Sequence, residues 1–98
     1  MATVSYSSAA VADLERLARF LREVRPEHAE ATAGLIEEAL GILQQHPLIG
    51  RPTEAGLYEL LISRGRTGYV ALYEYRASTE QVLVHRIRHQ REAGLDED

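Results

Sequence analysis

Apolar and polar residues form three short runs over the last third of the chain, each with the length and the aliphatic and aromatic content of a β-strand. The runs are Leu57–Ser63, Tyr69–Tyr75 and Gln81–Arg88. Five residues separate each run from the next, and a connection this short returns the chain antiparallel to the strand before it. The pattern therefore predicts an antiparallel meander of three strands.

The first half of the chain carries the spacing of two α-helices. Thr3–Tyr6 is predicted as a short first strand, and Ser7–Ser8 offers N-cap hydroxyls for a helix over about residues 9–24. A second helix is predicted from Pro26, which suits a first helical turn, to Gln45, because the residue after Gln45 precedes a proline. The apolar stripe that the first helix is expected to bury is Val11, Leu14, Leu17, Leu21 and Val24.

The order of these elements, β-α-α-β-β-β, predicts an α+β fold in which an αα-hairpin covers one face of a small antiparallel sheet. The pattern does not place the first strand within that sheet. The connector His46–Pro52 is stiffened by its two prolines, and Gly50 permits an unusual turn. Leu48 and Ile49 are expected to anchor this connector to the core.

Strand parity sorts the sheet residues onto two faces. The face that the helices are expected to cover carries Tyr69, Ala71, Tyr73, Tyr75, Leu83, His85 and Ile87. The other face carries Val70, Leu72, Val82, Val84, Arg86 and Arg88. An apolar strip with an arginine border, left open on a small domain, indicates a surface for a partner. The tyrosines are interpreted as core residues rather than as a platform for stacking bases.

Composition narrows the class of protein. The 98 residues make one domain, 1–98, with a solvated acidic end expected at 92–98. No apolar run approaches the ~18 residues of a membrane span, and no signal peptide is recognised, so a cytoplasmic protein without membrane contact is expected. The chain has neither cysteine nor lysine, and a net charge of −4 makes it a poor non-specific ligand for nucleic acid.

Arginine and histidine supply the candidate chemistry. Six of the eleven basic residues fall between Arg64 and Arg91. His85 and His89 do not lie at a recognised ligand spacing, so neither a metal nor another cofactor is expected. His85 alternates with predicted core positions and is expected to point inward, whereas His89 lies past the predicted sheet.

Three segments, in this order, resemble the RelE/ParE superfamily, the toxins of type II toxin–antitoxin modules. They are the opening Tyr6–Ala10, the connector HPLIGRP at His46–Pro52, and ISRGRTGYVALYEY…VLVHRIRHQREAG across Ile62–Gly94. The likeness covers nearly the whole chain. It implies a small toxin of the plasmid-stabilisation type, neutralised by a cognate ParD-like antitoxin whose helical or extended segment wraps the toxin.

The resemblance implies one of two activities. ParE-like members inhibit DNA gyrase, whereas RelE-like members cut mRNA in the ribosomal A site. RelE-like members typically supply lysines after the helices, an arginine after the strand's Gly-Tyr and a tyrosine near the C-terminus. This chain has no lysine, has Val70 after Gly68 and Tyr69, and has Leu95 near its end. Gyrase inhibition is therefore expected, and cleavage of ribosome-bound mRNA is the alternative.

The candidate site residues come from the sheet and its arginines. Target binding is assigned to Arg64, Arg66, His89 and Arg91. Antitoxin binding is assigned to Val70, Leu72, Val82, Val84, Arg86 and Arg88, since the planar fork of arginine suits carboxylates. If the chain is a ribonuclease, the candidate catalytic residues are His85, His89 and Arg91.

Overall fold

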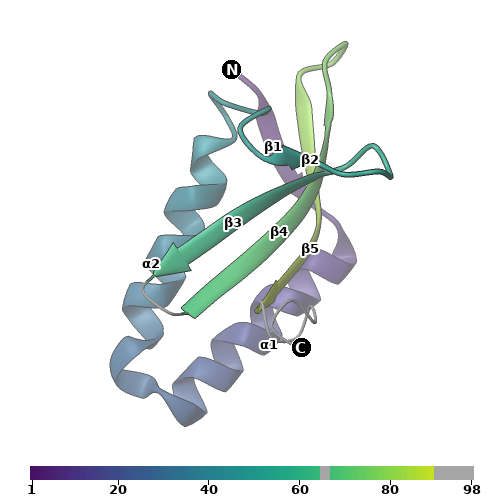
Figure 1. Cartoon of the computed structure of the whole chain (residues 1–98). Coiled ribbons are helices and arrows are strands. Elements are labelled where there is room, and N and C mark those ends of the chain that lie inside the picture. The colour runs from purple at the N-terminus through teal and green to yellow at the C-terminus, as the bar shows by residue number, and fades with distance from the viewer. Residues whose placement is uncertain (65–66, 90–98) are drawn as a thin grey trace.

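Two helices pack on one side of a five-stranded sheet (Figure 1). This computed structural model describes residues 1–64 and 67–89, except for the side chains of residues 63, 64 and 67. In chain order the elements are β1 (Thr3–Tyr6), α1 (Ser8–Val24), α2 (Pro26–Ile42), β2 (Arg51–Pro52), β3 (Tyr58–Arg64), β4 (Thr67–Arg76) and β5 (Gln81–His89). The strands lie in the order β1-β5-β4-β3-β2. The predicted α+β fold with a helical hairpin on the sheet is confirmed.

The sheet is mixed rather than wholly antiparallel. β2, β3, β4 and β5 are antiparallel to their neighbours, but β1 runs parallel to β5, from the Thr3–Gln81 pair to the Tyr6–Val84 pair. Short connections force the antiparallel direction within the meander. The chain between β1 and β5 includes both helices, so no local constraint sets their relative direction.

Ser7 caps α1 and connects it to β5. The Ser7 Oγ accepts a hydrogen bond from the Ala10 N–H (3.0 Å) and donates one to the His85 carbonyl (2.9 Å). The buried residues of α1 are Ala10, Asp13, Leu17 and Leu21. The stripe is rotated from the predicted one, because Val11 and Val24 are exposed and a carboxylate is buried in their place.

Pro26 is the first residue of α2, as predicted. The regular helix ends at Ile42, and the N–H groups of Gln44 and Gln45 then bond to carbonyls three residues back. The buried side chains of α2 and its end are Thr32, Ile36, Leu40 and Leu43. Within residues 1–64 and 67–89, no helix has the length and apolar character needed to cross a bilayer.

A β-bulge interrupts the pairing of β4 with β5. Leu72 pairs with Arg86, but the next residue, Tyr73, pairs with Val84. His85 is therefore one extra residue on β5, opposite no partner of its own. Because side chains alternate with a period of two, one extra residue reverses the alternation beyond it.

The bulge decides which residues of β5 face the helices. Val82 and Val84 before it, and Ile87 beyond it, are all fully buried. The predicted placement of Val82 and Val84 on the open face is therefore wrong. Leu83, predicted for the helix face, lies opposite Glu74 on the other face. The prediction for β4 is confirmed, since its core residues are Tyr69, Ala71 and Tyr73.

Tyr73 holds the connector between α2 and β2. Its buried hydroxyl donates a hydrogen bond to the Pro47 carbonyl (2.8 Å) and accepts one from the Gly50 N–H (2.9 Å). Gly50 is needed for this close approach and not for a left-handed turn, because a Cβ there would lie 2.7 Å from the Tyr73 hydroxyl oxygen. Leu48 and Ile49 do not anchor the connector as predicted, since both are more than half exposed.

Candidate partner-binding face

The face of the sheet away from the helices, here called the open face, carries a row of apolar side chains. Cross-strand pairing sets Leu61 beside Val70 and Glu74 beside Leu83, with Leu72 between them along β4. Leu61 is 59% exposed, and the other three apolar residues are partly buried. Leu61, Val70, Leu72 and Leu83 are called the apolar strip below.

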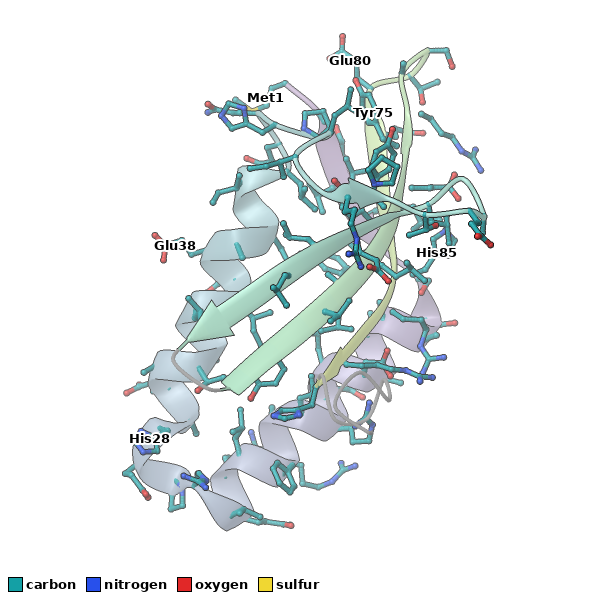
Figure 2. All side chains as sticks on the ribbon, viewed as in Figure 1. Met1, His28, Glu38, Tyr75, Glu80 and His85 are labelled. Carbon is teal, nitrogen blue, oxygen red and sulfur yellow. The ribbon has the colours of Figure 1, made fainter. Side chains whose placement is uncertain are left out.

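Ion pairs border the apolar strip. Arg51 on β2 is paired with Glu59 on β3. On β4, the Glu74 carboxylate bonds His85 Nε2 (2.8 Å) and Arg76 Nε (2.6 Å). Figure 2 shows the His85 side chain beside the sheet. The hydrogen bonds from His85 and then from Arg76 lower the pKa of Glu74 below its ordinary value. His85 is thus a partly exposed residue of the bulge and not the inward-pointing residue that the alternation predicted.

The guanidinium of Arg86 is turned to α1 rather than to the apolar strip. Asp13 Oδ2 accepts hydrogen bonds from Arg86 Nε (2.8 Å) and the Ile87 N–H (2.9 Å). Asp13 Oδ1 accepts from Arg86 Nη2 (3.1 Å) and Arg16 Nη2 (3.2 Å). Burial alone would raise the pKa of Asp13, but the bonds from Arg86, Ile87 and Arg16 outweigh it and lower the pKa to about 2.

The carboxylate of Asp13, with Arg16 and Arg86 bonded to it, covers part of an exposed edge of the sheet. β1 covers β5 only as far as the Tyr6–Val84 pair. Beyond that point no strand of the described residues lies beside the outer edge of β5. The Asp13 carboxylate takes the N–H of Ile87 that a further strand would have bonded. Arg86, predicted to bind an antitoxin, therefore has a structural partner within the chain.

Among the described residues, Arg88 is a cation that lies beside the apolar strip. It lies opposite Val70 on the open face and is partly buried. Within the part of the chain that the structure describes, Arg88 forms no ion pair or hydrogen bond through its guanidinium. Its position suits a partner that supplies a carboxylate next to an apolar side chain.

The structure does not bring the two candidate ribonuclease histidines together. His85 lies on the open face, whereas His89 lies opposite the buried Tyr69 on the helix face, with the two rings edge to face and their centroids 5.2 Å apart. Four residues of strand, about 13 Å, separate the two histidines. The predicted residues that lie outside the described part of the chain are Arg66, Arg91 and the side chain of Arg64.

Asp13 and Leu61 are the residues of this region that the sequence reasoning missed. Asp13, Leu17 and Leu21 are spaced four residues apart, so the helical period alone places this carboxylate on the buried stripe. Leu61 sits among adjacent apolar residues of β3, where composition does not tell one face from the other.

Known proteins share this chain's sequence over most of its length. The family model described as the ParE toxin of the type II toxin–antitoxin system parDE matches residues 4–94. Toxin RelE3 of Caulobacter vibrioides is 35% identical over 89 residues, which cover 91% of this chain and 95% of the relative.

Solved structures share the fold. The chromosomal ParDE toxin–antitoxin system from P. aeruginosa matches with a TM-score of 0.74 and 25% identity, covering 91% of this chain and 96% of that chain. The toxin–antitoxin complex RelBE2 from Mycobacterium tuberculosis matches with a TM-score of 0.58 and 28% identity, covering 90% and 96%. A metal-bound toxin from Helicobacter pylori, at 14% identity and a TM-score of 0.54, covers 94% and 98% and shows the fold alone.

No group of three or more His, Asp or Glu side chains within the described residues of this chain is arranged to hold a metal ion. The two helices on a mixed five-stranded sheet and the sequence matches together define a toxin of a type II toxin–antitoxin system, of the ParE/RelE superfamily. Within that superfamily the chain belongs to the ParE toxin family. The resemblance found in the sequence is confirmed.

Proposed function

We propose that this protein inhibits DNA gyrase, the activity that the resemblance to ParE-like toxins implies, and that a cognate antitoxin neutralises it by covering the open face. Two comparisons support the first half: the ParE family model matches residues 4–94, and the likeness to the ParDE system, at a TM-score of 0.74, exceeds that to RelBE2, at 0.58. The relative named Toxin RelE3 means that names alone do not separate the two activities. The positions of the polar side chains distinguish gyrase inhibition from RNA cleavage better than the names do.

The observation that carries the proposal is that the two candidate catalytic histidines, His85 and His89, lie on opposite faces of the sheet. Cutting RNA through its 2′-hydroxyl requires a base for the proton and cations beside the scissile phosphate. His85 is bonded to Glu74, and Arg86 is bonded to Asp13. His89 lies on the opposite face of the sheet. Among the described residues these groups do not form a cluster that could act on one phosphate.

The antitoxin half of the proposal is supported by the open face. The apolar strip is bordered by paired charges, with Arg88 beside Val70 as a cation for a partner's carboxylate. An antitoxin segment that lays apolar side chains along Leu61, Val70 and Leu72 and an acidic side chain at Arg88 satisfies both features. The ParDE and RelBE2 structures are both of toxin–antitoxin systems.

The test uses purified full-length toxin with purified gyrase, relaxed plasmid and ATP. Supercoiling should fall as toxin is added and should recover when the antitoxin encoded beside the toxin gene is added in equimolar amount. The same toxin preparation goes into a translating extract, where mRNA ends are mapped. Codon-phased cuts in mRNA together with unaffected supercoiling would overturn the proposal in favour of ribosome-dependent cleavage.

A further inference from the structure

One side of α1 carries exposed apolar residues past the point where β5 ends. Asp13, Arg16, Phe20 and Val24 follow one another at spacings of three and four residues, so they lie along one side of the helix. Asp13 is bonded to the Ile87 N–H, which shows that this side faces the path of β5. Phe20 is 53% exposed and Val24 is 54% exposed. These two residues are called the α1 patch.

The end of β5 points along α1 toward this patch. The Ser7 hydroxyl bonds the His85 carbonyl and the Asp13 carboxylate bonds the Ile87 N–H, so the two elements run in the same direction. His89, the last residue of β5, lies about 7 Å beyond Ile87. With a rise of about 1.5 Å per helical residue, its level on α1 is about four residues past Asp13. The chain therefore leaves β5 beside the half of α1 that carries the patch.

The sequence that follows β5 contains an apolar residue within reach of the patch. Nine residues follow His89, and Leu95 is the large aliphatic residue among them. The six residues from His89 to Leu95 span up to about 20 Å when extended. Phe20 and Val24 lie only about 4–10 Å further along α1 than the level of His89. Leu95 can therefore reach the patch with chain to spare.

The charges of this segment also match those of α1. Arg16 and Arg86 both bond the Asp13 carboxylate, so two guanidinium groups share one carboxylate and the cluster carries a net positive charge. The Arg16 side chain is 38% exposed and lies one helical turn before Phe20, where a further carboxylate can approach it. Residues 90–98 hold one arginine and four acidic residues, which are Glu92, Asp96, Glu97 and Asp98.

We propose that residues 90–98 dock on α1 in the free toxin, with Leu95 against Phe20 and Val24 and an acidic side chain beside Arg16, instead of forming the solvated end that composition indicates. Attachment to β5 favours this segment as the occupant. A short tether gives it a millimolar effective concentration at the patch, so a separate partner has to displace it. The inference is independent of the choice between gyrase and mRNA as the target.

An engineered disulfide tests the docking directly, because the chain has no cysteine of its own. The full-length variant Phe20→Cys/Leu95→Cys is treated with oxidised glutathione, and the intramolecular disulfide is quantified by mass spectrometry. Such a bond needs Cα atoms about 4.4–6.8 Å apart. The matched control is Val11→Cys/Leu95→Cys. Val11 is 44% exposed on the same helix, but it lies two and a half turns, about nine residues, from Phe20 and so on the opposite side.

The disulfide should form at least about tenfold faster in the first variant than in the control, because docking raises the local concentration of one thiol at the other. Equal rates overturn the inference, since an undocked segment reaches both positions. Disulfide-linked dimers in place of the intramolecular bond also overturn it and assign the patch to a second copy of the chain.

Thermal unfolding of full-length variants gives an independent test. Leu95→Ser should lower Tm by about 4 °C in the wild-type background, because a covered aliphatic side chain is lost. The same substitution should change Tm little in the Phe20→Ser background, where its contact is already absent. Val11→Ser is the control background, and there the full effect should return. An unchanged Tm for Leu95→Ser in the wild type, or an equal fall in all three backgrounds, overturns the inference.

Discussion

Asp13 on α1 and Arg86 on β5, 73 residues apart in sequence, form a two-point ion pair, with Arg86 Nε 2.8 Å from one carboxylate oxygen and Nη2 3.1 Å from the other. The Ile87 N–H bonds the same carboxylate at 2.9 Å. Asp13 is buried, and its burial is compensated by donors from two elements. The pair fixes the part of β5 beyond the bulge, which carries Arg88, against the first helix.

Replacing Asp13 by Ala should lower the free energy of unfolding by about 2–4 kcal/mol, because it leaves the Ile87 N–H unbonded and removes the buried carboxylate that Arg86 and Arg16 bond. The measurement is urea denaturation followed by circular dichroism. Glu15→Ala on the exposed side of the same helix is the matched control and should change stability by less than about 0.5 kcal/mol. A loss below about 1 kcal/mol for Asp13→Ala would show that the cluster does not stabilise the fold.

Acid should weaken the fold through Asp13. Its pKa is lowered from the ordinary 3.8 to about 2 in the folded chain, so its contribution is complete above the ordinary value and is lost as the pH falls toward the folded one. The expected loss is about 2 kcal/mol. The free energy of unfolding is measured for the wild type and Asp13→Asn between about pH 5 and about pH 2.

The difference in stability between these two proteins should shrink by about 2 kcal/mol over that range, since the variant has no carboxylate to protonate. Glu74, whose pKa is also lowered, is present in both proteins and cancels from the comparison. A difference that stays constant down to about pH 2 would contradict the assignment.

Gly50→Ala should destabilise the protein by about 1–3 kcal/mol, because the new methyl would lie 2.7 Å from the Tyr73 hydroxyl oxygen and 2.8 Å from the Glu59 carbonyl oxygen. Gly34→Ala within α2 is the control, since a Cβ there meets no atom within 4 Å. Alanine at position 34 should stabilise the helix by about 0.5–1 kcal/mol. Thermal unfolding of both variants tests the prediction: Tm should fall for Gly50→Ala and rise for Gly34→Ala. Shifts of the same sign would contradict it.

Arg88→Ala should weaken binding of the antitoxin by about tenfold, since a charge-assisted contact beside the apolar strip is removed. The stability of the free toxin should not change, because Arg88 bonds no described side chain. Calorimetry with the antitoxin measures the affinity, and Arg25→Ala, at the exposed end of the helical hairpin, controls for the loss of one positive charge. Equal affinities for wild type and Arg88→Ala would remove Arg88 from the interface.

The candidate site could be predicted only in part. Alternation alone places Val70, Leu72 and Arg88 on the open face, and the structure agrees. β4 has no extra residue, and Arg88 lies beyond the bulge of β5, where the predicted alternation holds. Val82 and Val84 were misplaced, since an extra residue in a strand changes its parity without changing its composition. Leu48 and Ile49 were expected in the core from hydrophobicity, but the Tyr73 hydroxyl holds the connector and leaves them in water.

The amino-acid sequence by itself determined the order and type of the main elements, because helical spacing, the Ser7 cap, the Pro26 start and short connections act within a few residues of chain. Only the tertiary structure decided the parallel pairing of β1 with β5, the bulge at His85 and the burial of Asp13. The first and the last of these join residues from opposite ends of the chain, and the bulge lies between two strands that follow one another. These features depend on which strand edges and backbone N–H groups still lack hydrogen bonds after the helices and strands have formed. A local sequence pattern does not contain that information.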